Sequence, residues 1–258
     1  MLFHTRRLLA GLFVIISIAG AALAQPYAYV TSANGQNVTV INRPTNTRIA
    51  LISVPGAPSG AAVTPDGAYL YVTGSSSNTV YVISTATRAI VKQIAVGLKP
   101  MVVAISPNGA LAAVANQGAN TASLISTSTN TVLATVPVGT YPSGLAFTPD
   151  SSKVLVANRL SSSVSVINTA THTVSATWHA LSGPAGAAVS ADGTVAYVAN
   201  QYANVVTVHS VSTGAILQSI TGFVSPNSLA LAPNGAKLWV SGLLRCLDQL
   251  IADEALAH

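Results

Sequence analysis

Carboxylates are scarce in this chain, which has only six Asp and Glu residues among 258. Three of the six lie in a short tail after residue 242, which leaves Asp66, Asp150 and Asp192 for the rest of the chain. These three occupy matching positions, each in the same kind of turn. A pair of facing carboxylates, as general acid–base hydrolysis of glycosides requires, is therefore hard to assemble.

Basic and reactive side chains are also few. The eleven Lys and Arg residues are scattered, with no basic run between aromatics, so we expect no nucleic-acid partner. The one cysteine, Cys246, cannot form an internal disulfide. The histidines lack ligand spacing, and no Gly-x-Ser-x-Gly, Walker or dinucleotide motif is present. We therefore expect no metal and no cofactor.

The N-terminus carries a targeting pattern. Arg6 and Arg7 precede an apolar stretch at 8–20 and a small-x-small cleavage site at 22–24. The pattern predicts a bacterial Sec-type signal peptide over 1–24, and an uncleaved N-terminal anchor is the alternative. We expect a periplasmic, extracellular or cell-surface protein that is not stably inserted in a membrane after cleavage.

A 42-residue repeat organises the chain from Tyr27 to Gly242 without insertion or deletion. A fixed period of this length is typical of repeat architectures. The most regular marker is a Pro-Asp or Pro-Asn step, which one copy replaces by Ala-Asp. This step begins at Pro65, Pro107, Pro149, Ala191 and Pro233.

Each repeat contains four short apolar runs that alternate with polar residues. In the central copy they lie at 144–148, 153–157, 164–167 and 173–178. Val, Ile, Thr and Tyr predominate, and polar turns separate the runs, which indicates antiparallel strands. We predict an all-β fold, a β-propeller of four-stranded blades, over residues 25–242. About five blades are present, as an incomplete open array or one closed by its terminal strands; a β-sandwich is the rival.

The tail at 243–258 differs in composition from the repeats. Its leucines fall at helical spacing, and it holds half of the carboxylates and the only cysteine. The pattern predicts a short C-terminal helix. One interpretation is a frameshift or truncation that replaced further repeats, and the other is a native helix that caps an edge strand.

A tetrapeptide close to Tyr-Val-Thr-Asn, in whole or in its last residues, begins at Tyr29, Tyr71, Ala113, Leu155 and Tyr197. It is accompanied by a downstream Val-x-Val-Ile run such as Val164–Ile167 and by the Pro-Asp turn. With these markers the repeat resembles the YVTN-type β-propeller repeat of bacterial and archaeal exported and surface-layer proteins. The resemblance implies an exported propeller that acts as a structural or interaction module.

The connections fall into two sets. The first and third turns of each repeat are nearly identical between copies, as structural turns should be. The other connections vary and provide a candidate binding face with Lys99, Tyr141, Arg159 and Tyr202. The residues expected to be structural turns are Asp66, Asn108, Asp150, Asp192 and Asn234.

Three bulky residues depart from the repeat at positions that should be buried. His209 replaces an isoleucine that four other copies keep, and we expect it to be a buried, hydrogen-bonded histidine. Trp178 and Trp239 also stand at expected core positions.

The sequence favours a non-enzymatic propeller that binds an unidentified envelope protein or glycan. The alternative is a propeller lactonase-like hydrolase, whose residues would lie on the innermost strands around the central channel. Those strands carry no acid and no histidine here, which weighs against catalysis. A truncated, non-functional fragment is the third interpretation.

Overall fold

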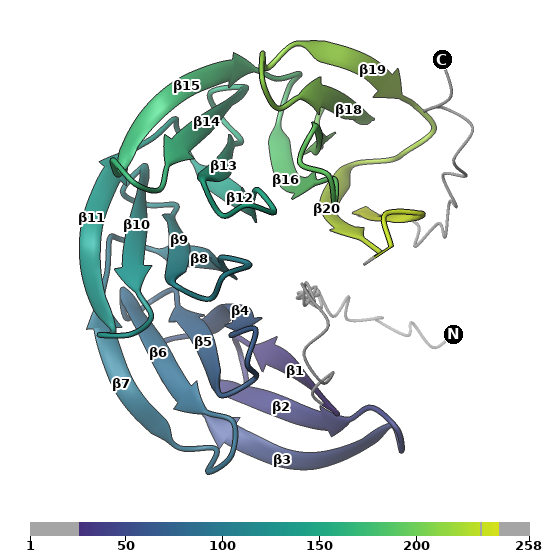
Figure 1. The fold of residues 1–258 in the computed structure, drawn as a ribbon. Helices are drawn as coiled ribbons and strands as arrows, with labels where there is room; N and C mark the ends of the chain where they lie inside the picture. Colours follow the sequence, from purple (N-terminus) through teal and green to yellow (C-terminus); the bar gives the residue numbers. More distant parts are fainter. Residues whose placement is uncertain (1–25, 233, 243–258) are drawn as a thin grey trace, which may run out of the picture.

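The computed structural model describes residues 26–232 and 234–242. Every regular element in these ranges is a β-strand, and 21 strands form six antiparallel sheets (Figure 1). In each sheet, strands that follow one another in sequence are hydrogen-bonded neighbours. The alternating pattern of the repeat is therefore realised as a series of hairpin meanders.

The first sheet has three strands: β1 (Tyr27–Ser32), β2 (Asn37–Asn42) and β3 (Thr47–Ser53). The second has β4 (Pro58–Val63), β5 (Tyr69–Gly74), β6 (Thr79–Ser84) and β7 (Ile90–Ala95). The third has β8 (Pro100–Ile105), β9 (Leu111–Asn116), β10 (Thr121–Ser126) and β11 (Thr131–Pro137).

The fourth sheet has β12 (Pro142–Phe147), β13 (Lys153–Asn158), β14 (Ser163–Asn168) and β15 (Thr173–His179). The fifth has β16 (Pro184–Val189), β17 (Val195–Asn200), β18 (Val205–Ser210) and β19 (Ile216–Ile220). The sixth has two strands, β20 (Pro226–Leu231) and β21 (Leu238–Gly242).

The sheets are arranged side by side in an arc, in the manner of propeller blades (Figure 1). β4, β8, β12, β16 and β20 line the inside of the arc, and β3, β7, β11, β15 and β19 form its outer rim. Neighbouring inner strands approach closely where β4, β12 and β16 carry Gly60, Gly144 and Gly186. A Cβ atom on Gly144 would lie 2.5 Å from the Ala185 carbonyl oxygen.

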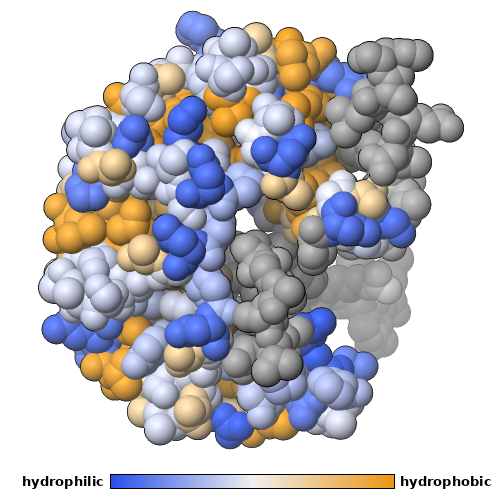
Figure 2. Space-filling model, viewed as in Figure 1, coloured by the Kyte–Doolittle hydropathy of each residue, from blue (hydrophilic) through white to orange (hydrophobic). Residues whose placement is uncertain are grey.

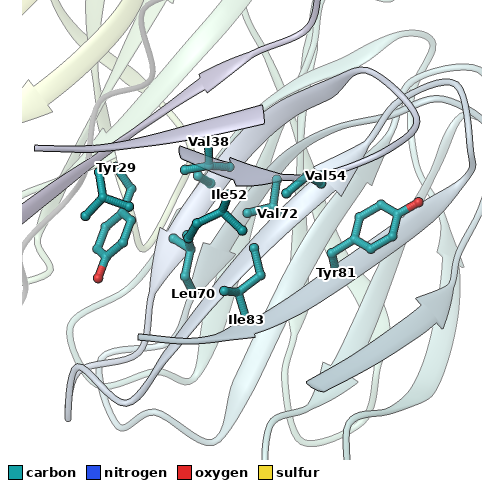
Figure 3. Close-up of a cluster of buried hydrophobic side chains, with 10 residues drawn as sticks. Tyr29, Val38, Ile52, Val54, Leu70, Val72, Tyr81 and Ile83 are labelled. Carbon is teal, nitrogen blue, oxygen red and sulfur yellow. The ribbon is translucent and has the colours of Figure 1, made fainter. Parts of the chain in front are cut away.

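The core lies between adjacent sheets rather than within one of them. Val38 and Ile52 of the first sheet pack against Leu70, Val72 and Ile83 of the second (Figure 3). All five are at most 6% exposed. A single four-stranded sheet cannot bury both of its apolar faces alone, so each sheet depends on its neighbours for stability.

The outer rim stays partly apolar. Every pairing of an outermost strand with its neighbour contains a register shift, as at Val166/Ile167. Such bulges increase the twist of an edge strand and discourage pairing with another chain. Figure 2 shows hydrophobic patches on the rim. On the outermost strands, Leu51, Leu133 and Leu217 are 53%, 47% and 59% exposed.

The fold-class prediction is wrong in its number of blades. We expected about five blades, but the structure has six separate sheets, and none of the described sheets closes the arc by pairing its first and last segments. No helix occurs among the described residues, and the tail at 243–258, where we expected one, lies outside them. The signal peptide predicted at 1–24 lies outside them as well. None of the described elements is a helix long and apolar enough to cross a membrane.

Candidate functional site

Two sets of connections lie at opposite ends of the strands. The first set, here called the loop face, joins the second strand to the third in each four-stranded sheet, β1 to β2 in the first sheet, and each sheet to the next. It comprises 33–36, 54–57, 75–78, 96–99, 117–120, 138–141, 159–162, 180–183, 201–204 and 221–225. The second set, the turn face, holds the remaining hairpins. All four predicted binding residues lie on the loop face, and all five predicted turn residues lie on the turn face.

Asparagine side chains link neighbouring connections of the loop face by hydrogen bonds. The side-chain oxygen of Asn78 accepts a hydrogen bond from the Lys99 backbone N–H at 2.9 Å, and that of Asn120 accepts one from Tyr141 at 2.9 Å. Each bond ties a hairpin to the connection that enters the next sheet. Asn78 and Asn120 are 42 residues apart, and their equivalent hydrogen bonds mark them as structural.

Lys99 and Tyr141 are held in a left-handed backbone conformation, with φ values of 53° and 61°. Both directly precede a buried proline that starts an inner strand. The next copy has Gly183 at this position, with φ 75°. Since glycine adopts this conformation without steric cost, bulky residues there are retained against a local strain.

The four predicted binding residues meet in two pairs. The Lys99 ammonium lies 5.6 Å from the centre of the Tyr141 ring, and the Arg159 guanidinium lies 5.1 Å from that of Tyr202. Both distances are within the range of cation–π attraction. The Arg159 N–H also donates to the Tyr141 carbonyl oxygen at 3.0 Å, so the two pairs share one backbone link.

Arg159 has unused hydrogen-bonding capacity. Its Nε is buried without a hydrogen-bond partner, and none of its guanidinium nitrogens forms a hydrogen bond or ion pair within the described residues. The guanidinium lies over the Tyr202 ring, and Arg159 as a whole is only partly buried. Gln117 and Gln201 occupy the same position in neighbouring copies and also carry a buried, unpaired side-chain oxygen.

Apolar side chains surround these cations. Leu98 and Leu160, which are the chain neighbours of Lys99 and Arg159, are 59% and 57% exposed. Tyr202 is 54% exposed and Leu181 is 36% exposed. Exposed large apolar side chains grouped on one face are typical of interaction sites.

The turn face holds the three described carboxylates in one repeated arrangement. In each copy, one carboxylate oxygen of the Asp accepts a hydroxyl hydrogen bond at 2.5 Å and a backbone N–H bond at 3.0 Å. These bonds lower the pKa of Asp66 and Asp192, and they lower that of Asp150 to about 2. Asn108 and Asn234 accept the same backbone bond, at 3.0 and 3.1 Å.

A groove of about 470 Å³ lies between three turn-face hairpins. It is lined by Asp66 and Tyr69 from the first, Asn108 from the second, and Ser128 and Asn130 from the third. Burial raises the pKa of the underlying Tyr71 hydroxyl to about 12, and this hydroxyl donates to the Asn130 side-chain oxygen at 2.5 Å. The Asn130 side-chain oxygen is therefore already occupied by an internal hydrogen bond.

His209 is buried and hydrogen-bonded, as we expected. Its Nδ1 lies 3.1 Å from the Gly214 carbonyl oxygen, which only an N–H can satisfy, so Nε2 accepts from the Thr207 hydroxyl at 2.9 Å. The ring stacks on Trp178 with a centroid distance of 5.8 Å. Trp178 is 5% exposed, which confirms its core position, but the same expectation for Trp239 is wrong because that side chain is 43% exposed.

Among the described residues, no group of three or more His, Cys, Asp or Glu side chains could hold a metal ion. The described carboxylates lie on the turn face, and His209 lies at the interface between the fourth and fifth sheets. The loop face offers cations, aromatic rings and apolar side chains, a set suited to binding.

Comparisons with known proteins agree with a propeller-like repeat fold. A model described as Choice-of-anchor I domain matches residues 61–159, a segment that includes three of the four predicted binding residues. This match indicates a cell-surface or exported protein. A search of curated proteins gave no match.

Two solved structures resemble the chain in fold. Kuenenia stuttgartiensis hydrazine synthase matches with 19% identity and a TM-score of 0.65, over 93% of this chain and 95% of that one. A functionally unknown protein from Desulfotomaculum acetoxidans matches with 16% identity and a TM-score of 0.78, over 84% of this chain and 73% of that one. At these identities the likeness concerns the fold alone.

Proposed function

We propose that this protein is a non-enzymatic binding module of the bacterial envelope, which uses its loop face to hold a protein or glycan. The observation that carries the proposal is the meeting of Lys99, Tyr141, Arg159 and Tyr202 in two cation–aromatic pairs. Binding residues commonly lie on connections that a rigid scaffold positions.

Comparison between the repeats supports the same function. At the Arg159 position other copies carry Ala33, Ser75, Gln117 and Gln201, so the fold does not need a cation there. Lys99 and Tyr141 hold left-handed positions that glycine fills elsewhere without strain. Residues that the fold does not require, kept at some conformational cost, are candidates for function.

The resemblance to YVTN-type repeats and the signal-like N-terminus favour export, in agreement with the anchoring domain match. We therefore place the binding partner in the periplasm or at the cell surface. The protein would require no cofactor for this role.

The test compares retention of solubilised envelope proteins and arrayed glycans by purified wild-type protein and by two variants. The loop-face variant combines Lys99→Ala, Tyr141→Ser, Arg159→Gln and Tyr202→Ser, each a residue that another repeat uses at that position. The turn-face control combines Asp66→Asn, Asp150→Asn and Asp192→Asn. We expect retention to be lost in the loop-face variant and kept in the control.

Equal retention by both variants would contradict the assignment of the loop face. An assay of lactone hydrolysis with and without divalent metal ions examines the enzymatic alternative. Metal-dependent turnover that survives in the loop-face variant would show that the protein is a hydrolase whose site lies elsewhere.

A further inference from the structure

The ligand chemistry of the loop face can be specified further. We infer that the loop face binds an acidic segment of a partner protein, in which carboxylates alternate with large apolar side chains. This inference rests on the proposed function, because it names the ligand class of the same face.

The charged residues of the loop face are all of one sign, whereas the turn face carries Arg43 and Arg88 beside its carboxylates. In the described part of the chain, the loop-face segments contain Lys99 and Arg159 as their charged residues and no carboxylate. The three described carboxylates, Asp66, Asp150 and Asp192, all lie on the turn face. A face with charge of one sign attracts partners of the opposite sign and repels those of the same sign.

Arg159 has the position and the unused hydrogen-bond donors to bind a carboxylate. Its guanidinium is fixed against the Tyr202 ring at 5.1 Å and uses none of its donors within the described residues. The planar guanidinium fork matches a carboxylate, to which it can donate two parallel hydrogen bonds. Because the contact with Tyr202 already restricts the guanidinium, the Arg159 side chain loses little further freedom when a ligand binds there.

Exposed leucines favour a protein rather than a polysaccharide as the source of the carboxylates. Leu98 and Leu160 flank the two cations along the chain, and both are more than half exposed. Branched aliphatic side chains gain most from burial against other apolar side chains, which a peptide supplies and an acidic sugar does not. Tyr and Arg are also the residues most often responsible for protein–protein affinity.

The experiment pans a random peptide library displayed on phage against the intact protein. Parallel panning uses an Arg159→Gln/Lys99→Ala variant, whose replacements occur at the same positions in other repeats, at Gln117 and Ala57. We expect the wild type to enrich peptides with Asp or Glu beside Leu, Ile or Phe. The variant should not enrich them, although its thermal unfolding should match that of the wild type.

Three outcomes decide the inference. Replacing Glu by Gln in an enriched peptide should weaken its affinity at least about tenfold, since a bidentate charged hydrogen bond is lost. Enrichment without acidic residues, or no enrichment over the variant, would overturn the inference. Binding of polygalacturonate without enrichment of any peptide would also overturn it and identify an acidic polysaccharide instead. In both latter cases, a loop-face variant that still loses envelope retention would leave the proposed function standing.

Discussion

At Lys99 and Tyr141 the fold requires the left-handed backbone conformation but not the side chains. Each residue has its N–H held by an asparagine and is followed by a buried proline, so the position itself is structural. The side chain is not structural, because Ala57, Gly183 and Ser225 occupy it in other copies with positive φ. A side chain in this conformation costs roughly 1 kcal/mol relative to glycine.

The first prediction concerns replacement of both residues by glycine. The double variant Lys99→Gly/Tyr141→Gly loses a cation–π contact worth about 0.5–1 kcal/mol but is relieved of backbone strain of similar size. We expect the free energy of unfolding in urea to change by less than about 1 kcal/mol, while retention of envelope ligand falls at least about tenfold.

Ser225→Gly is the matched control for this prediction. It makes the same backbone change at φ 52°, in a copy that has no cation or ring at the position. Its ligand retention should equal that of the wild type. Equal loss of retention in the control and the double variant would assign the effect to backbone geometry and not to the side chains.

A second residue-scale feature is the correlated replacement around His209. The other copies have isoleucine at this position, and a Cβ atom on Gly214 would lie 2.1 Å from the Trp178 ring. The tryptophan can therefore stack on the histidine only because position 214 is glycine. These three residues form one local variation of the core between the fourth and fifth sheets.

The second prediction is a dependence of stability on pH that originates at His209. Burial lowers the pKa of this imidazole, although the Gly214 carbonyl opposes the shift. Between the lowered folded pKa and the unfolded value of about 6.5, the unfolded chain binds more protons than the folded chain. The contribution of His209 to stability is therefore complete above about pH 6.5 and is lost as the pH falls through the folded pKa.

Thermal unfolding of the wild type and His209→Ile between about pH 4 and pH 8 checks this prediction. The isoleucine variant restores the residue of the other copies and cannot titrate, so its midpoint should fall less steeply on acidification below about pH 6.5. Parallel curves for the two proteins would show that His209 does not carry the acid sensitivity.

At the scale of elements, the turn-face hairpins show how a conserved local geometry can use different side chains. In the hairpin between β12 and β13, Asp150 accepts bonds from the Thr148 hydroxyl and the Ser152 N–H. Asn108 accepts the equivalent bonds from Ser106 and Ala110. The required group is one side-chain oxygen at this position, which either residue supplies.

The third prediction follows from this equivalence. Asp150→Ala removes the acceptor and should lower the free energy of unfolding by about 1 kcal/mol, whereas Asp150→Asn should cost less than half of that. Because the pKa of Asp150 is lowered to about 2, the difference between wild type and Asp150→Asn should shrink as the pH falls from about 4 towards 2. Equal destabilisation by both substitutions would contradict the turn role.

The sequence predicted the periodic elements well and the departures from them poorly. Strands and turn residues recur every 42 residues, so each copy supports the prediction for the others. The four candidate binding residues were chosen for the charge and aromatic rings that they offer on variable loops. Their pairing was not visible because Arg159 and Tyr202 lie on different hairpins. Trp239 was misplaced because its counterparts Tyr71, Ala113 and Leu155 pack against the following sheet, and no described sheet follows the sixth.

At the scale of the whole molecule, stability is shared between neighbouring sheets. Each described apolar cluster combines buried residues of two adjacent sheets, and none draws on a third. The inner strands add close backbone contacts, at Gly60 against Met101 and at Gly144 against Ala185. In such a linear array, damage at one interface should affect its two sheets most and distant sheets least.

The fourth prediction uses Gly144→Ala to test this coupling. The added methyl group would lie 2.5 Å from the Ala185 carbonyl oxygen and 2.9 Å from the Gly186 Cα, so β12 and β16 must move apart. Overpacking of this kind costs roughly 1–3 kcal/mol. Hydrogen exchange should show lost protection in β12–β15 and β16–β19, with β4–β7 close to wild type.

Gly235→Ala is the control, because no atom lies within 4 Å of its added Cβ. It should lose protection only locally, from its positive φ of 73°. Uniform loss of protection across all sheets in Gly144→Ala would mean that the arc unfolds as one cooperative unit instead of as coupled neighbours.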